Sequence, residues 1–188
     1  MKKIVKEAIK IHQRLVSEFE SRHVDTVIAI AEMITGCFGQ GGCIYLCGNG
    51  GSAADAQHVA GEFVGRFRKH RRALPAVALS ADTSVLSCIG NDFGFKDVFA
   101  RQVEALVKKG DILWAFSMSG SSENIVSAAE AAKKKSASVV AFTGRPNSPL
   151  EKLADTCLAV DAPSAGAAQE IGQLAYHIIC ELVDEQMF

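Results

Sequence analysis

The stretch from Ile44 to Arg66 reads IYLCGNGGSAADAQHVAGEFVGR and predicts a strand, a glycine-rich turn and a helix in succession. Its first residues are apolar and suit a buried strand. Gly48, Gly50 and Gly51 permit backbone angles that other residues avoid. Ser52 stands where a helix N-cap is expected. The free N–H groups at such a helix start can bind an anion such as phosphate, so this unit predicts an anion site directly after the first strand.

Strands and helices alternate along the rest of the chain. Further strands are expected at 76–79, 112–116, 137–142 and 157–160. Helices are expected at 2–20 and 24–37, from 53 onward, and at 85–89, 98–107, 125–132, 148–153 and 167–183, with 90–95 as a loop. This alternation favours an α/β fold with a parallel sheet covered on both faces. No linker or repeat interrupts it, so we expect one domain over 1–188, with N-terminal helices in 1–40 and an α/β core in 41–188. The two N-terminal helices could pack on the sheet or on a second subunit.

Composition excludes several function classes. The 188 residues are 48% hydrophobic and carry a formal net charge of -1, which offers no attraction to nucleic acid or to a membrane surface. No apolar run is long enough to span a bilayer, and the N-terminus lacks the layout of a secretory signal, so a cytoplasmic location is expected. The six cysteines form no CxxC pair, which favours buried, reduced thiols over a thiolate metal site or nucleophile.

A second strand–turn–helix unit contains Ser117-Met118-Ser119-Gly120-Ser121-Ser122. Ligands of parallel sheets bind at the carboxyl ends of the strands, where the turns at 48–52 and 117–122 are both expected. The serine turn has no lysine or arginine, but its hydroxyls, its N–H groups and the helix dipole can hold a phosphate. An ordinary helix cap is the simpler interpretation of the serine turn alone.

The glycine turn also fits the GxGxxA form of a dinucleotide-binding fingerprint. That motif needs an acidic residue about twenty positions further on, whereas Asp82 lies about thirty positions away. In this chain two helices precede the motif, whereas dinucleotide-binding folds usually begin with it. A nicotinamide or flavin enzyme is therefore the weaker hypothesis, and the absence of a Lys-Ser/Thr pair excludes a Walker A loop.

Candidate acid, base and ligand groups lie on two expected helices. His58 and Glu62 are spaced i,i+4, which fits a surface pair, two metal ligands or an acid–base couple. Gln169, Gln173 and His177 share one face of the last helix, and His177 lies near its apolar stripe, where an ordinary core histidine is the simpler interpretation. Together, two imidazoles with Glu62 and Gln169 form a plausible zinc set, and Glu62 and His177 could also move protons.

The basic run from Arg66 to Arg72 reads as a solvated helix end and loop. We expect Arg66 to be the exception, one turn further along the face of His58 and Glu62.

Five segments resemble the sugar isomerase (SIS) domain family, namely CGNGGSAADAQH at 47–58, GEFVGRF at 61–67, IGNDFGF at 89–95, SMSGSS at 117–122 and QEIGQLAYH at 169–177. The resemblance implies a three-layer, flavodoxin-like fold with a five-stranded parallel sheet and a homotetramer with sites between subunits. It also implies the conversion of sedoheptulose 7-phosphate to D-glycero-D-manno-heptose 7-phosphate through an enediol. That reaction is the first step of ADP- or GDP-heptose synthesis for lipopolysaccharide and other bacterial surface polysaccharides.

The resemblance also implies roles for residues of this chain. Glu62 and His177 would be catalytic and would move protons between the sugar carbons and oxygens. One zinc ion per subunit would be bound by His58, Glu62, Gln169 and His177. Substrate and phosphate would be bound by Asn49, Gly50, Gly51, Ser52, Glu62, Arg66, Asn91, Asp92, Ser117, Ser119, Ser122 and Gln169.

Three positions depart from the family pattern. Met118 replaces a common threonine, Gly166 replaces an aspartate or threonine, and Gly172 replaces a histidine. These changes leave open an isomerase for another sugar phosphate. Two non-enzymatic alternatives are a SIS tetramer that associates with a replication initiator and a sugar-phosphate sensor, which would need a DNA-binding domain. The complete acid, base and ligand set favours the enzyme.

Overall fold

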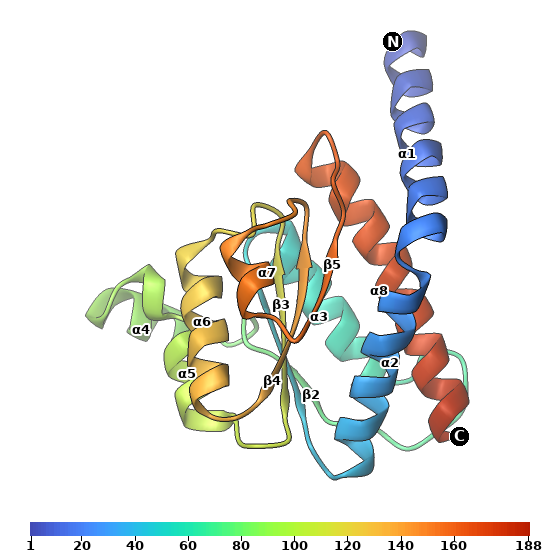
Figure 1. The fold of residues 1–188 in the computed structure, drawn as a ribbon. Coiled ribbons are helices and arrows are strands. Elements are labelled where there is room, and N and C mark those ends of the chain that lie inside the picture. The colour runs from blue at the N-terminus through green and yellow to red at the C-terminus, as the bar shows by residue number, and fades with distance from the viewer.

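The computed structural model describes residues 1–188 and is built on a sheet of five parallel strands in the order β2-β1-β3-β4-β5 (Figure 1). The strands are β1 Ile44–Gly48, β2 Ala76–Ala78, β3 Ile112–Ser117, β4 Ser138–Thr143 and β5 Thr156–Ala159. This is the strand order of flavodoxin-like folds, so the expected sheet and its topology are confirmed. In such a sheet the chain turns into a helix at the carboxyl end of each strand, which is where ligands bind.

Helices cover both faces of the sheet (Figure 1). They are α1 Lys2–Arg22, α2 Val24–Gly39, α3 Gly51–Val64, α4 Thr83–Asp92, α5 Ala100–Leu106, α6 Glu123–Lys134, α7 Pro149–Leu153 and α8 Ala165–Met187, with a 3₁₀ turn η1 at Phe95–Asp97. The helices α2, α3 and α8 form one hydrophobic core with the sheet, and α5, α6 and α7 form the other. Because side chains alternate along a strand, Trp114 faces the first core and Leu113 faces the second.

Several helix boundaries differ from the prediction. Gly50, with φ 54°, is the N-cap of α3, so Ser52 lies inside the first turn of the helix instead of capping it. The expected loop at 90–95 is wrong in its first half, because α4 continues to Asp92. The carboxylate of Asp82 accepts a bond from the Val85 amide and begins α4 two residues earlier than expected.

The basic run after α3 also differs from the prediction. The helix ends at Val64, so Arg66 lies beyond it and does not continue the face of His58 and Glu62. Arg68 is exposed, as expected of a solvated run. The side chain of Arg71, however, is completely buried and pairs with Asp184.

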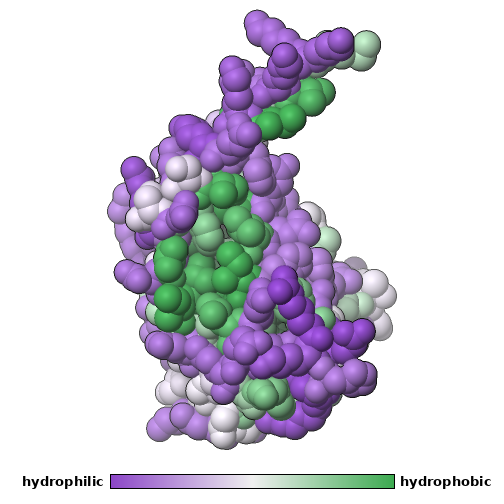
Figure 2. Space-filling view, turned by 90° about the vertical axis from the view of Figure 1, so that its right-hand side faces the viewer, coloured by the Kyte–Doolittle hydropathy of each residue, from purple (hydrophilic) through white to green (hydrophobic).

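The N-terminal helices have different surroundings. The helix α2 packs against α8 and β5, whereas residues 1–10 of α1 are all exposed and project from the body (Figure 1). Figure 2 shows a broad hydrophobic area on the side of the molecule that carries these helices. The exposed apolar side chains of α1 and α2 include Ile4, Ile9, Val24 and Ile28. The sequence left open where these helices pack. In the structure α2 and the second half of α1, through Leu15 and Phe19, pack into the first core beside α8.

All six cysteines are free, in agreement with the predicted thiols. The expected burial is wrong for Cys88, which is exposed on α4. None of the helices combines the length and the apolar character that crossing a bilayer requires.

Candidate functional site

A cavity of about 240 Å³ lies where the two predicted turns meet at the carboxyl ends of β1 and β3. Its lining brings together seven of the residues expected to bind substrate and phosphate, and it also contains Met118; the seven are Asn49, Gly51, Ser52, Ser117, Ser119, Ser122 and Gln169. Gly50 shapes the turn through its positive φ and is not part of the lining. The N-termini of α3 and α6 begin at these turns, so their free N–H groups and helix dipoles favour an anion in the cavity.

The serine turn is arranged around converging hydroxyl groups. Ser117 Oγ donates to Ser122 Oγ at 3.1 Å, and Ser119 Oγ accepts a bond from the Ser121 amide at 3.2 Å. Gly120 has φ 64°, and a Cβ atom there would lie 2.2 Å from Ser148, so only glycine fits this position. This tight turn therefore brings the hydroxyls of Ser117, Ser119 and Ser122 close to one another beside a helix N-terminus, without any cation.

A second group of side chains lies further along α3 and α8. His58 Nε2 is 3.1 Å from Glu62 Oε1 and 3.4 Å from His177 Nε2. One ligand atom from each of the three residues lies within 4.8 Å of the others. Two imidazoles and a carboxylate are ligands that zinc accepts, and three protein ligands leave a position for substrate. The donor set therefore fits the expected zinc ion.

Gln169, the fourth expected ligand, lies between the cavity and the histidines. Its amide Nε2 donates to Asp55 Oδ2 at 2.7 Å, so the structure connects it to a carboxylate that the sequence analysis did not single out. A Cβ atom on Gly51 would lie 2.5 Å from the same amide. The bond to Asp55 holds Gln169 against the start of α3, and the lack of a side chain at Gly51 leaves room for its amide.

Tyr176 orients His58. Its hydroxyl is 3.1 Å from His58 Nδ1, and the tyrosine itself is almost fully buried. Burial raises the pKa of Tyr176, with Asp55 adding to the effect, so the phenol stays protonated. When Nε2 of His58 offers its lone pair to a metal, Nδ1 carries the proton and donates to the tyrosine oxygen.

Burial lowers the pKa of His177, and the neighbouring His58 lowers it further, while Glu62 acts in the opposite direction. The imidazole of His177 is therefore neutral at pH 7. A neutral ring can bind a metal or accept a proton, and a protonated one can do neither.

The two groups of residues are adjacent because α3 and α8 run side by side in the same direction. Gly51 and Asp55 meet Gln169, and His58 meets Tyr176 and His177. The step from Gly51 to His58 is about 10 Å along a helix. A phosphate in the cavity and a reacting carbon at the histidines would thus be separated by a distance of that order.

Three expected substrate contacts are not brought to this site. Arg66 is exposed beyond the end of α3, and Asn91 and Asp92 lie at the end of α4, which Figure 1 shows on the opposite side of the molecule from α8. The amide of Asn91 instead donates to Asp92 at 2.8 Å. Within one chain none of these three side chains lines the cavity.

The structure adds residues that sequence reasoning missed: Asp55, Arg71, Asn124, Tyr176 and Asp184. Asn124 bonds Asn49, which lines the cavity, and Arg71 and Asp184 join α3 to α8. Asp55 could have been found from its place one turn before His58 on the same helix face. No local pattern marks the other four residues.

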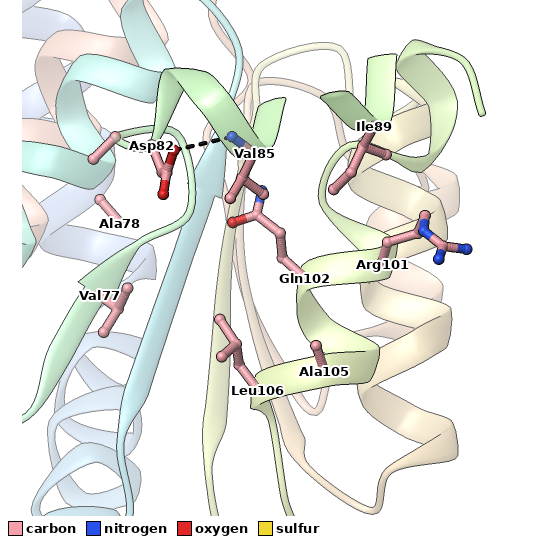
Figure 3. A pocket seen from close by; sticks show the side chains of 10 residues that line it. Val77, Ala78, Asp82, Val85, Ile89, Arg101, Gln102, Ala105 and Leu106 are labelled. Atoms are coloured by element: carbon pink, nitrogen blue, oxygen red, sulfur yellow. Dashed lines mark hydrogen bonds between the residues drawn. The ribbon is translucent and has the colours of Figure 1, made fainter. Parts of the chain in front are cut away.

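A larger cavity, of about 510 Å³, lies elsewhere, between β2, α4 and α5 (Figure 3). Its lining is mostly apolar, including Val77, Val85, Ile89 and Leu106, and it contains neither a histidine nor a serine. It therefore lacks the groups that the chemistry needs.

Comparison with known proteins gives a consistent result. The model of the SIS domain family matches residues 9–144. The phosphoheptose isomerase of a Roseiflexus species is 46% identical over 86% of this chain and 82% of its own length. That of a Nitratiruptor species is 52% identical over 76% of each. The solved structure of phosphoheptose isomerase GmhA from Neisseria gonorrhoeae covers 98% of both chains with a TM-score of 0.93 and 38% identity. That of a phosphoheptose isomerase from Francisella tularensis covers 97% of both with a TM-score of 0.94 and 31% identity.

Proposed function

The chain belongs to the SIS domain family, among the phosphoheptose isomerases, and on this premise we propose that it interconverts sedoheptulose 7-phosphate and D-glycero-D-manno-heptose 7-phosphate. The observation that carries the proposal is that the serine-lined cavity lies next to the cluster of His58, Glu62 and His177. This substrate carries its phosphate on C7 and reacts at C1 and C2, so its two ends need separate sites of this kind.

The phosphate end is proposed to bind at the two turns. Ser52, Ser117, Ser119 and Ser122 offer hydroxyls, and the starts of α3 and α6 offer N–H groups. Because neutral donors and helix dipoles supply the attraction, no cation is needed at the cavity.

The reacting end is proposed to lie at Glu62 and His177. The Glu62 carboxylate takes a proton from C1 of the ketose while O2 gains one, which produces an enediol. A proton then returns to C2 as O1 loses its own, and the aldose forms without any net gain or loss of atoms. The neutral His177 ring suits the proton transfers at the oxygens.

A zinc ion is proposed at His58, Glu62 and His177, with Gln169 as a fourth ligand. When bound, it would polarise the substrate oxygens and stabilise negative charge on them. Zinc alone serves as the probe, titrated into metal-free protein and followed by calorimetry. One site per chain is expected, with a loss of affinity in His58→Ala; unchanged binding in that variant would contradict the ligand assignment.

A homotetramer is proposed as the working form. The projecting half of α1 exposes Ile4 at 74% and Ile9 at 52%, and Figure 2 shows hydrophobic surface on the same side. Arg66, Asn91 and Asp92 would then contact the substrate of a neighbouring subunit. Light scattering tests the assembly. Mixing two inactive variants, Glu62→Gln and Asp92→Ala, tests the shared site. Recovered activity would support a shared site, and a mixture that stays inactive would contradict it.

Turnover is the decisive experiment. Purified protein is incubated with sedoheptulose 7-phosphate and the aldose is followed by NMR. We expect conversion by the wild type and a loss of about 100-fold or more in Glu62→Gln and His177→Ala, the usual range for a catalytic acid or base. Circular dichroism controls for the fold. Turnover that survives both changes would refute the roles of these residues.

Other functions receive less support. Association with a replication initiator is not favoured, because the relatives are named as isomerases and the acid, base and ligand set is complete. Another sugar phosphate is tested by offering shorter ketose phosphates in the same assay. A cytoplasmic location and a place in heptose synthesis for surface polysaccharide are part of the proposal, and cell fractionation and the glycans of a deletion strain test them.

A further inference from the structure

A completely buried ion pair joins the two helices that carry the reacting groups. Arg71 Nε donates to Asp184 Oδ1 at 2.6 Å, and the two side chains are 0% and 2% exposed. Burying two charges is costly unless their remaining donors and acceptors are also satisfied. The burial of this ion pair therefore needs an explanation in the contacts that its two side chains make.

The rest of the Arg71 guanidinium caps the end of α3. Its Nη2 donates to the carbonyl oxygen of Glu62 at 2.9 Å, and Nη1 donates to that of Phe63 at 2.9 Å. The last carbonyls of a helix have no partners within it, and a cation at that end also complements the helix dipole. Arg71 thus holds the backbone of the residue whose carboxylate faces the histidines.

Asp184 completes the arrangement from α8. Its second oxygen accepts the backbone amides of Arg68 and Lys69, both at 3.3 Å, which fixes the loop that carries Arg71. Asp184 lies seven positions after His177, two turns along the same face of α8. One face of α8 therefore carries both residues. His177 faces the side chain of Glu62, and Asp184 pairs with Arg71, which binds the Glu62 backbone.

We propose that Arg71 and Asp184 are positioning residues that set the distance between the Glu62 carboxylate and His177. This inference rests on the proposed function, because the pair can affect the reaction only through the position of Glu62. The pair does not touch the serine cavity, so its loss leaves phosphate binding intact. It acts on the proton-transfer step and on the metal ligands alone.

The test compares the wild type with Arg71→Lys, which keeps the charge but lacks the planar fork, and with the double variant Arg71→Met/Asp184→Leu. The double variant replaces the pair by apolar side chains, which often preserves stability. We expect kcat to fall about 10- to 100-fold in both, as for a displaced catalytic group, with KM unchanged within about twofold. Zinc affinity, measured by calorimetry with zinc alone, should fall about 10- to 100-fold.

Two controls separate positioning from stability. Val139→Ala shortens a fully buried side chain in the core on the other face of the sheet, so it lowers the melting temperature without touching α3 or α8. Lys133→Met removes another ion pair of 2.6 Å, remote from the site. Both should keep wild-type kcat and zinc affinity.

The proposal is overturned if either folded Arg71 variant retains wild-type kcat and zinc affinity, or if Val139→Ala loses both to the same extent. A variant that does not fold is replaced by Asp184→Asn, which keeps the size of the side chain and removes its charge. Absence of turnover in the wild type would refute the proposed function alone, because the zinc measurement still decides whether the pair positions Glu62.

Discussion

Asn49 and Asn124 bond each other through both amide groups. Asn49 Nδ2 donates to Asn124 Oδ1 at 2.9 Å, and Asn124 Nδ2 donates to Asn49 Oδ1 at 2.8 Å. Asn49 belongs to the turn after β1, and Asn124 lies in the first turn of α6, after the serine turn. The reciprocal pair therefore fixes the spacing of the two turns that line the cavity.

Asn124→Ala should widen the cavity and raise KM for the sugar phosphate. Asn124 is 3% exposed, and its truncation would remove both hydrogen bonds of the half-buried Asn49 amide. We expect the free energy of unfolding to fall by about 1–3 kcal/mol, with kcat less affected than KM. Denaturant unfolding and steady-state kinetics measure both. Glu130→Ala, at an exposed site on the same helix, is the control, and an unchanged KM in Asn124→Ala would show that the pair does not set the cavity.

Gly51→Ala should weaken substrate binding through Gln169. A Cβ atom would lie 2.5 Å from Nε2 and 2.8 Å from Oε1 of Gln169, so the amide must move away from Asp55. Loss of a hydrogen bond to a charged group predicts an increase in KM of about tenfold or more. Gly61→Ala on the same helix is the matched control, because its Cβ meets nothing within 4 Å. The control should gain about 0.5–1 kcal/mol in helix stability. Equal KM values for the two variants would contradict this account.

Met118→Thr should strengthen phosphate binding. Met118 lines the cavity between Ser117 and Ser119, so a threonine there would add a hydroxyl beside the two serines. One additional hydrogen bond predicts a decrease of about two- to tenfold in the inhibition constant of inorganic phosphate and in KM. Met118→Leu, which changes the shape without adding a donor, should leave both constants near the wild-type value. A leucine variant that binds as tightly as the threonine variant would exclude the hydroxyl as the cause.

His23, at the junction of α1 and α2, should make stability depend on pH. Burial lowers its pKa below the usual 6.5, and the neighbouring Arg22 lowers it further. Between the two pKa values the unfolded chain binds more protons than the folded one, so stability falls as the pH drops below 6.5 toward the folded-state pKa. Thermal unfolding at about pH 7.5 and about pH 5.5 should show a smaller difference in His23→Asn than in the wild type. The same difference in both proteins would assign the pH effect to other groups.

Much of the fold and part of the site could be predicted from local pattern. Apolar strands that alternate with helices require a covered parallel sheet, and the turn after β1 was placed correctly because it needs a glycine with positive φ, which is Gly50. The motif on α3 and the i,i+4 spacing of His58 and Glu62 indicated one half of the cluster of His58, Glu62 and His177. Periodicity on α8 indicated His177 as the other half.

Errors in the prediction arose where tertiary contacts override local preference. Arg66 was expected on the face of Glu62, but α3 ends before it, and the cation that does reach Glu62 is Arg71. A run of basic residues normally lies in water, and only a buried carboxylate on another helix changes that for one of its members.

Chain-local periodicity and glycine geometry thus sufficed for the layers, the strand–turn–helix units and the candidate chemistry, because they act over a few neighbouring residues. Folding alone decided which distant groups meet. Asn49 and Asn124 are 75 positions apart, and Arg71 and Asp184 are 113 apart. No sequence spacing encodes such pairs, since each joins a turn or loop to a distant helix and their contact depends on how these elements pack against one sheet.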